Sequence, residues 1–300
     1  MNTSFQQITP EMICGIVVTY EPDQRLISRL SILSKQLTKL VIIDNSVLKK
    51  DLQFIANSFD SEKLLLISNK KNLGLGFALN QGLIEAKKLG YAFVIFFDQD
   101  SRIFADSISN MCSIFNCIND KNIGLLGGSY KKTLDKKNKI NSFGLTYIKK
   151  KSNITSGSLM SLDIFEKVGL FRADYFIDCI DSEFCLRLRK NGYSIYQTAI
   201  PIMEHAVGSP LVFKFYKYKF VSTNHSADRR YYIARNHFVM LREYRSYISK
   251  VPFFWAFKAI KRSFYFSFIV ILFEQQKINK LKAIALGFKD GIFNKMGMRN

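Results

Sequence analysis

Short apolar runs alternate with helical patterns through the N-terminal third of the chain, and this alternation limits the fold more than any other feature. The runs expected to form buried strands cover residues 12–20, 40–43, 64–67 and 91–97. The segments expected to form helices between them cover residues 24–37, 52–59 and 74–89. Strands that alternate with helices in this way form a largely parallel sheet with helices on both faces. The sequence therefore predicts an α/β fold.

Polar residues follow most of these strands directly. Asp44-Asn45-Ser46, Ser68-Asn69 and Asp98-Gln99-Asp100 each come after a buried run, and the first run ends at Thr19-Tyr20. The carboxyl ends of parallel strands meet at one edge of the sheet, where open α/β folds bind ligands. Asp98 and Asp100 supply two hard oxygen ligands for a divalent cation, which can hold a diphosphate. Taken alone, this pair fits a metal site and a polar turn equally well.

Beyond residue 101 the alternation is weaker. Helices are expected at 103–118, at 162–168 and over the second half of 176–189, where Asn191-Gly192 is a favourable stop. Strands are expected at 123–128, 155–160 and 193–198, and an exposed loop or hairpin at 131–140.

A glycine-punctuated segment, Asn72-Leu73-Gly74-Leu75-Gly76-Phe77-Ala78-Leu79-Asn80-Gln81-Gly82, starts the helix expected at 74–89. Small residues allow close backbone approach, and a helix N-terminus favours an anion. The glycine spacing departs from the dinucleotide fingerprint G-x-G-x-x-G, and no Gly-rich turn follows the first strand. A dinucleotide-binding Rossmann fold is therefore disfavoured.

Three further groups are candidates for chemistry. Asp44 fits either an acceptor for the imide N–H of uracil or thymine, or a turn residue. Asp178, Asp181 and Glu183 lie at a helix start, where acids either cap the helix or act as a general base. His205 fits either a third metal ligand or a structural role.

The charge of the chain limits its possible binding partners, and its cysteines indicate the cellular compartment. The net charge is +20, and residues 201–300 hold 18 Lys and Arg against 5 Asp and Glu. This excess favours an anionic partner: nucleic acid, an anionic membrane surface or a phosphorylated substrate. The five cysteines show no C-x-x-C pair, and the N-terminus lacks a signal-peptide pattern, which indicates a reducing cytoplasm. No apolar run reaches about 18 residues, so no transmembrane helix is expected.

Taken in order, these segments resemble the family 2 glycosyltransferases, which have the GT-A fold, from about residue 13 to about residue 245. The segments that carry the resemblance are Ile16-Val17-Val18-Thr19-Tyr20, Val41-Ile42-Ile43-Asp44-Asn45-Ser46, Asn72–Gly82, Asp98-Gln99-Asp100, Ile180–Arg187 and Arg229-Arg230-Tyr231-Tyr232-x-x-Arg235-Asn236. The family pattern Glu-Asp-x-Asp-x-x-x-Arg aligns its base with Asp181, although Ile180 stands where Glu is usual.

The resemblance implies a GT-A catalytic domain over 1–205, with a nucleotide-binding half (12–101) and an acceptor half (102–205). A basic, membrane-proximal helical region would follow over 206–300. Asp181 would be the catalytic base of an inverting transfer, and Mg²⁺ or Mn²⁺ would bind Asp98, Asp100 and His205. The implied nucleotide-sugar-binding residues are Thr19, Tyr20, Glu21, Asp44, Asn45, Asn72, Gly76, Asn80, Asp98, Gln99 and Asp100.

Within the family, 97–101 and 176–178 look most like the bacterial rhamnosyltransferases that use dTDP-L-rhamnose. This implies a lipid-diphosphate-linked saccharide acceptor, a place in O-antigen or other surface polysaccharide synthesis, and a peripheral position on the cytoplasmic face of the membrane. A UDP-hexose donor is the alternative within the family. A nucleic-acid-binding protein is the alternative of another class, but it leaves the acids at 44, 98, 100 and 181 unexplained, because they would repel phosphate.

The basic C-terminal region contains two aromatic segments. Residues 213–220 interleave Lys with Phe and Tyr, which suits either single-stranded nucleic acid or a membrane interface. In 251–273, Phe253, Phe257, Ile260 and Phe264 are expected on one helical face, and 258, 261 and 262 supply basic residues on the other. This pattern predicts an in-plane amphipathic helix, with a helix packed on the catalytic domain as the alternative.

Overall fold

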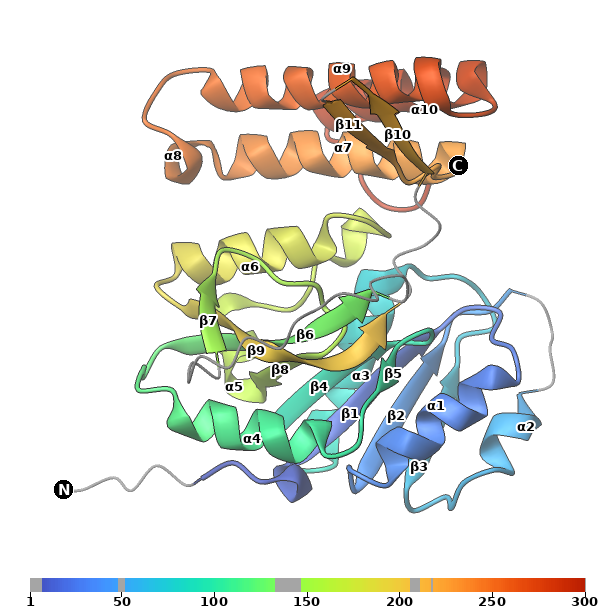
Figure 1. Ribbon diagram of the computed structural model, residues 1–300, viewed down its shortest axis with the longest axis vertical. Helices are drawn as coiled ribbons and strands as arrows, with labels where there is room; N and C mark the ends of the chain where they lie inside the picture. Colours follow the sequence, from blue (N-terminus) through green and yellow to red (C-terminus); the bar gives the residue numbers. More distant parts are fainter. Residues whose placement is uncertain (1–6, 48–51, 133–146, 206–210, 217, 300) are drawn as a thin grey trace. The chain divides into compact units, whose positions relative to one another are not determined.

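The computed structural model describes residues 7–47, 52–132, 147–205, 211–216 and 218–299, which are drawn in colour in Figure 1. The chain forms two compact units. The first contains Met1–Phe171 and Phe184–Ala206, and the second contains Arg172–Glu183 and Val207–Asn300. The short segment 172–183, which the sequence places in the catalytic domain, therefore groups with the C-terminal region.

A mixed sheet forms the centre of the first unit. Its strand order is β3-β2-β1-β4-β8-β6-β9-β5, with β7 paired to β9. The strands are β1 (Ile13–Thr19), β2 (Lys39–Asp44), β3 (Leu64–Ser68), β4 (Phe93–Asp98), β5 (Arg102–Ile103), β6 (Ile123–Lys132), β7 (Tyr147–Lys150), β8 (Ser158–Ser161) and β9 (Ser194–His205). Neighbours from β3 to β4 are parallel, and β8 pairs antiparallel with both β4 and β6. The predicted α/β fold is confirmed.

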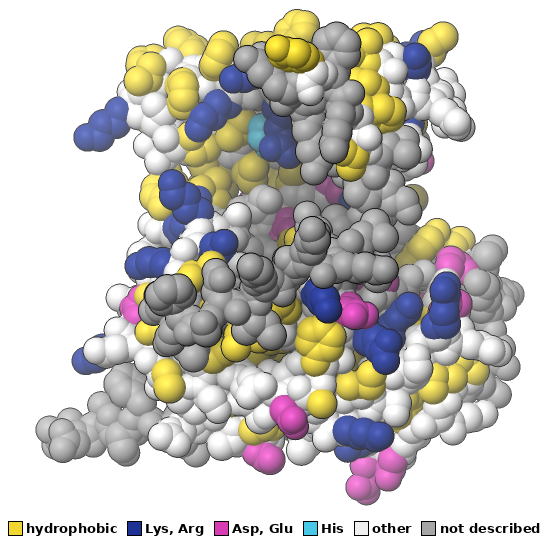
Figure 2. All heavy atoms as spheres, in the orientation of Figure 1, with side chains coloured by type: hydrophobic (Ala, Val, Ile, Leu, Met, Phe, Trp, Pro, Cys, Tyr) yellow, Lys and Arg dark blue, Asp and Glu magenta, His cyan; other side chains and the backbone are white. Residues whose placement is uncertain are grey.

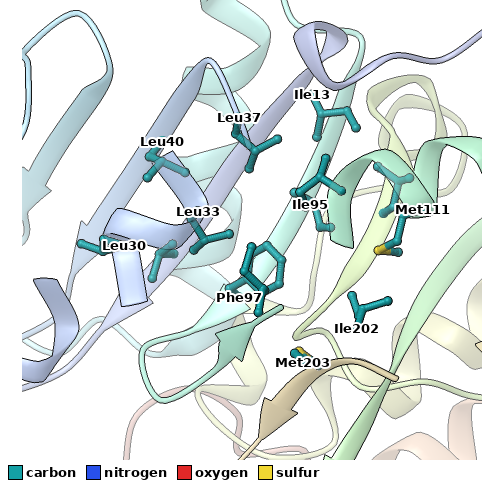
Figure 3. Packing of buried hydrophobic residues seen from close by; sticks show 14 of the residues in the cluster. Ile13, Leu30, Leu33, Leu37, Leu40, Ile95, Phe97, Met111, Ile202 and Met203 are labelled. Atoms are coloured by element: carbon teal, nitrogen blue, oxygen red, sulfur yellow. The ribbon is translucent and has the colours of Figure 1, made fainter. Parts of the chain in front are cut away.

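Helices cover both faces of this sheet (Figure 1). They are α1 (Arg25–Ser34), α2 (Gln53–Ala56), α3 (Leu75–Lys88), α4 (Ser107–Cys117), α5 (Leu162–Val168) and the part of α6 (Ile180–Lys190) that follows residue 183. Successive strand residues point to opposite faces. Ile95 and Phe97 join the core with α1 and α4, which Figure 3 shows from close by. Phe96, between them, packs on Phe165 of α5 with ring centroids 6.3 Å apart.

The register of the parallel strands brings their polar ends together. Thr19 of β1 lies beside Asp44 of β2, which lies beside Ser68 of β3, while Asp98 of β4 lies beside Val18. The chain runs from β1 outward to β3 and then returns to place β4 on the other side of β1. This reversal creates a topological switch point between β1 and β4, the usual ligand position in such sheets. The expected alignment of polar strand ends is confirmed.

Two expected boundaries are wrong. The helix expected at 103–118 begins as strand β5, because Ile103 is buried and pairs with Met203, and α4 starts at Ser107. The strand expected at 193–198 continues to His205 through Pro201. Proline is tolerated where a ladder is irregular, and the register shifts on both sides of the pair between Ser129 and Pro201.

The second unit contains a strand pair and a group of helices. Its elements are β10 (Leu211–Phe215), β11 (Tyr218–Ser222), α7 (Ala227–Glu243), α8 (Arg245–Ile248), α9 (Phe254–Phe273) and α10 (Lys277–Ile292). Ala234, Val270 and Ile284 form a small core between α7, α9 and α10. The region expected to be helical thus also contains an antiparallel hairpin, formed by the basic and aromatic run at 213–220. Alternating Lys and aromatic residues have the period of a strand.

Helix α9 has one side buried in the second unit and a large exposed surface. Ala259, Ile269 and Val270 are buried in the second unit. Phe257, Ile260 and Phe264 are exposed, and Lys258, Lys261 and Arg262 are exposed as well. Basic and apolar side chains therefore share the exposed surface of α9, beside the side that packs inward.

A buried group of ions lies where α9 ends. The carboxylate of Glu274 accepts hydrogen bonds from Arg230, from Ser222 at 2.6 Å and from Lys280 at 2.9 Å. Burial alone would raise the pKa of Glu274, but these partners outweigh it, and the pKa lies below its ordinary value. Because a buried charge is costly without a partner, Glu274 holds α7, α10 and the hairpin together.

In the part of the chain that the structure describes, no helix is both long and apolar enough to cross a membrane. All five cysteines are free thiols.

Gly82 sets the distance between α3 and the sheet. A Cβ at this position would lie 2.4 Å from Cγ2 of Ile16. We expect Gly82→Ala to lower the free energy of unfolding, because overpacking costs about 1–3 kcal/mol and exceeds the helix-propensity gain of about 1 kcal/mol. Urea denaturation would measure this loss. The exposed Ile84→Ala on the same helix is the control. A Gly82→Ala protein as stable as the wild type would contradict this packing.

Candidate active site

At the ends of β1 and β2, the Asp44 carboxylate organises its neighbours. It is 1% exposed and accepts hydrogen bonds from Thr19 Oγ1 at 2.7 Å, from Ser46 Oγ at 2.8 Å and from the Ser46 N–H at 3.2 Å. The Ser46 hydroxyl in turn accepts from the backbone N–H of Glu21, at 2.8 Å. Asp44 therefore fixes the shape of the strand edge, and its contact with a nucleobase stays a prediction.

Side-chain amides link β2, β3 and the start of α3. Asn45 donates to the carbonyl of Gly74 at 3.0 Å and accepts from Asn69 at 2.8 Å. Asn69 and Gln81 exchange two hydrogen bonds, of 2.7 and 2.9 Å. Asn72 caps the turn by accepting from the N–H of Gly74, whose φ of 89° favours glycine. The sequence predicted that Asn45 and Asn72 belong to the site. It did not predict Gln81, because no local pattern connects this residue with Asn69.

Gln99 closes the switch point between β1 and β4. Its side-chain oxygen accepts from the N–H of Tyr20 at 2.8 Å, and its side-chain nitrogen donates to the Tyr20 carbonyl at 3.1 Å. Arg29 donates to the Gln99 carbonyl at 2.9 Å. The amide of Gln99 is therefore occupied in joining two strand ends, which leaves the ring of Tyr20, 47% exposed, at this edge.

Asp98, the last residue of β4, and Asp100 flank Gln99 in the turn formed by residues 98–101, and both are partly exposed. Ser101 donates its N–H to the Asp98 carbonyl at 3.1 Å, and the Asp98 N–H bonds to Ser156 Oγ at 3.1 Å. The hydroxyls of Ser101 and Ser156 lie 2.7 Å apart. The turn that carries the two carboxylates is thus anchored to the loop before β8.

The chemistry of Asp98 and Asp100 fits Mg²⁺ or Mn²⁺, because Mg²⁺ commonly takes one or two carboxylates together with water and substrate phosphates. Among the described residues, no cluster of three or more His, Cys, Asp and Glu side chains exists. The expected third ligand, His205, ends β9, and its side chain lies outside the described residues. The antiparallel pair between Arg102 and Glu204 places the His205 backbone next to the turn at 98–101.

Two other expected binding residues have structural partners, and a third is buried. Asn80 exchanges two hydrogen bonds with the backbone of Phe171, at 2.9 and 3.0 Å. Glu21 has a φ of 47° and accepts from the Val47 N–H at 3.0 Å. Gly76 is buried in the first turn of α3. Donor binding by these three residues stays a prediction.

In the second unit, Asp181 lies in the first turn of α6. Its carboxylate accepts from the Ser182 N–H at 2.7 Å. Burial raises the pKa of Asp181, and the neighbouring Asp178 carboxylate raises it further, although the Ser182 N–H opposes this shift. A carboxylate with a raised pKa is a stronger base, and such perturbed groups gather at functional sites. Ile180, where the family pattern has Glu, is buried.

The other two acids of this segment are paired within the second unit. Asp178 forms an ion pair with Arg229, with N–O distances of 2.5 and 3.1 Å. Glu183 is 1% exposed and accepts a hydrogen bond from the Tyr244 hydroxyl at 2.5 Å. Sequence reasoning grouped the three acids and missed both partners, which lie about 50 to 60 residues away in the chain and carry no local signal.

Solved structures identify the class of fold. TarS 1–349 of S. aureus in complex with UDP-GlcNAc matches with a TM-score of 0.59 at 14% identity, over 93% of this chain and 81% of that one. GalNAc-T7 with UDP, GalNAc and Mn²⁺ matches with a TM-score of 0.51 at 12% identity, over 65% and 43%. The chain spans 44% of a longer TarS structure, with a TM-score of 0.55. The fold is that of the GT-A transferases.

Sequence comparisons narrow this class. The profile described as Glycosyl transferase family 2 matches residues 15–169. The chain is 30% identical over 299 residues to the dTDP-rhamnosyl transferase RfbF of Shigella flexneri, covering 93% of this chain and 95% of that protein. The chain therefore belongs to glycosyltransferase family 2, and it is a glycosyltransferase.

The charge of Asp178 provides a test of the electrostatics around Asp181. Because the Asp178 carboxylate raises the pKa of Asp181, we expect Asp178→Asn to lower that pKa. The unpaired Arg229 would act in the same direction. A ¹³C NMR titration of the aspartate carboxyls would show the midpoint of Asp181 moving to lower pH. Asp163→Asn, on the exposed start of α5, is the control. An unchanged midpoint in Asp178→Asn would contradict the assigned cause.

Proposed function

We propose that this glycosyltransferase moves L-rhamnose from dTDP-L-rhamnose to a hydroxyl of a lipid-diphosphate-linked saccharide, in the synthesis of O-antigen or another bacterial surface polysaccharide. The observation that carries the donor assignment is the similarity to a dTDP-rhamnosyl transferase along nearly the whole length of both proteins. The switch point between β1 and β4, with its paired carboxylates, supports a nucleotide-diphosphate site at this sheet edge.

In this proposal the first unit binds the donor. Thr19, Tyr20, Asp44 and Asn45 border the nucleoside, and the start of α3 lies at the same sheet edge. Asp98 and Asp100, with His205 as the expected third ligand, would hold Mg²⁺ or Mn²⁺. When bound, the cation offsets the negative charge of the diphosphate leaving group.

Asp181 is the general base of the proposed transfer. It takes the proton of the acceptor hydroxyl while the acceptor oxygen forms a bond to the anomeric carbon. The bond from that carbon to the diphosphate oxygen breaks, and dTDP leaves with the electron pair. Displacement in one step inverts the anomeric centre. The raised pKa of Asp181 supports this role, because proton transfer is most effective when the base has a pKa near the working pH.

The exposed surface of α9 supports attachment to an anionic membrane. Phe257 is 60% exposed, Phe264 is 72% exposed, and Phe268 and Ile271 continue the same stripe. Figure 2 shows hydrophobic side chains over α9 with Lys and Arg side chains among them. Aromatic residues mixed with basic ones match a lipid interface that carries negative headgroups. A membrane-bound enzyme would meet a lipid-linked acceptor at the cytoplasmic leaflet.

A donor panel tests the main proposal. We expect dTDP-L-rhamnose with Mn²⁺ to raise the melting temperature more than UDP-glucose, UDP-galactose or GDP-mannose, because bound ligand stabilises the folded state. Differential scanning fluorimetry measures the shift. A larger shift with a UDP-hexose would replace the rhamnose donor while keeping the enzyme class.

Asp181→Asn tests the base. We expect donor affinity to be unchanged and the transfer rate to fall about 10²–10⁴-fold, the usual contribution of a general base. Release of dTDP and isothermal titration would separate the two quantities. Asp163→Asn should behave like the wild type. Near wild-type turnover by Asp181→Asn would remove this residue from the mechanism.

Vesicle flotation tests the membrane surface. We expect the protein to float with vesicles rich in phosphatidylglycerol at low salt, and Phe264→Glu to stay in the soluble fraction because it places a charge in the apolar stripe. Ile84→Glu, at an exposed apolar position of α3, is the matched control. If the wild type fails to float, and is instead a dimer that Phe264→Glu dissociates, α9 joins two copies and the lipid assignment is wrong.

A further inference from the structure

The segment that leads into α6 has an unusual backbone. Phe176, Asp178 and Cys179 have φ values of 64°, 64° and 63°, although none of them is glycine. Residues with a side chain rarely adopt this conformation, and they keep it only where surrounding structure enforces it. Such strain collects at functional sites. Here it lies immediately before Asp181, so the groups that enforce it also set where α6 begins.

Asn236 of α7 is the centre of the groups that hold this segment. Its side chain is fully buried, and its Nδ2 donates to the carbonyl oxygens of Tyr175, Ile177 and Asp178, at 2.9, 2.8 and 3.0 Å. One amide group thus bonds three carbonyls around the strained turn. The orientation of the amide is fixed, because its Oδ1 accepts from Nε of Arg235 at 2.9 Å. A flipped amide would place oxygen against three carbonyl oxygens.

Arg235 extends the same contact. Its Nη2 donates to the carbonyls of Asp174 and Tyr175, at 3.2 and 3.1 Å, and its Nη1 donates to the carbonyl of Gly297 at 2.6 Å. The N–H of Gly297 donates to the Asp174 carbonyl at 2.7 Å. Arg235 as a whole is only 1% exposed, so its guanidinium forms these hydrogen bonds away from solvent. A buried cation bonded to backbone carbonyls is costly to disturb.

We infer that Arg235 and Asn236 are positioning residues for catalysis, which hold the turn 174–179 so that α6 presents Asp181 at a fixed place. This inference rests on the proposed role of Asp181 as base. Neither residue bonds Asp181 directly, and both act through the backbone that precedes it. A displacement of a reacting group by about 1 Å can reduce a rate by about 10²-fold. We call the hydrogen bonds from Arg235 and Asn236 to this turn the clamp. Loss of the clamp should therefore affect turnover more than donor binding, because donor binding is the proposed role of the first unit.

The test compares Asn236→Ala with Arg242→Ala. Arg242 lies on the same helix and donates to the carbonyls of Gly291 and Ile292, both at 3.0 Å, at the end of α10. Like Arg235 and Asn236, it donates from α7 to backbone carbonyls, but its partners lie outside the turn at 174–179. The rate of dTDP release from dTDP-L-rhamnose would be measured at a temperature well below both melting points, with a synthetic lipid-diphosphate-linked saccharide as acceptor.

We expect Asn236→Ala to lower kcat 10- to 100-fold while the donor KM stays within about twofold. Arg242→Ala should keep kcat within about threefold even where its melting temperature falls equally. Hydrogen exchange should increase in the peptide covering 174–182 of Asn236→Ala and stay unchanged there in Arg242→Ala. Wild-type kcat in Asn236→Ala, or an equal loss in both variants, would overturn the inference.

Two further variants keep the outcomes distinct. If Asn236→Ala does not fold, Arg235→Lys replaces it, because lysine retains the charge but lacks the Nε–H that orients Asn236. Arg235→Lys should then lower kcat while the donor KM stays nearly unchanged, and a wild-type kcat would overturn the inference. Asp181→Asn is measured in parallel. Full activity of Asp181→Asn rejects the proposed base, whereas an inactive Asp181→Asn beside a fully active Asn236→Ala rejects only the positioning role.

Discussion

The parallel pairing of β1 with β2 on one side and β4 on the other is the constraint on which the donor site depends. This register places Thr19 beside Asp44 and ends β4 at Asp98. Polar groups at the switch point then bond a neighbouring strand end, as when the side chain of Gln99 bonds the backbone of Tyr20. A slip of one residue would turn each side chain to the other face of the sheet. Because both faces of these strands are buried under helices, such a slip would repack the side chains on both sides of the sheet.

The two units keep their structure by different means. The first unit has a continuous apolar core in which α1 and α4 pack on the sheet. The second unit has small apolar clusters and buries charged groups instead: Glu274 with Arg230 and Lys280, and Arg235 against backbone carbonyls. Buried ions stabilise little on balance, but leaving one unpaired is costly. Such contacts favour one arrangement of the chain over alternatives, which suits a unit that holds a strained turn.

The sequence was sufficient to predict the elements that depend on local patterns. Continuous apolar runs gave the strands from β1 to β4, and polar residues after them gave the edge that carries Asp44, Asp98 and Asp100. It was insufficient where distant residues decide the structure. Pro201 lies inside β9 because of an irregular pairing with β6, and Ile103 forms a strand because Met203 is opposite. The partners of Asp178 and Glu183 lie on α7 and just after it, which no local pattern reveals.

The clamp formed by Arg235 and Asn236 donates its hydrogen bonds to carbonyl oxygens of the turn before α6. Backbone carbonyls are the same for every amino acid, so the clamp does not recognise the side chains of the turn. The constraints on the side chains of this turn therefore come from other contacts, such as the burial of Tyr175 and the ion pair of Asp178 with Arg229.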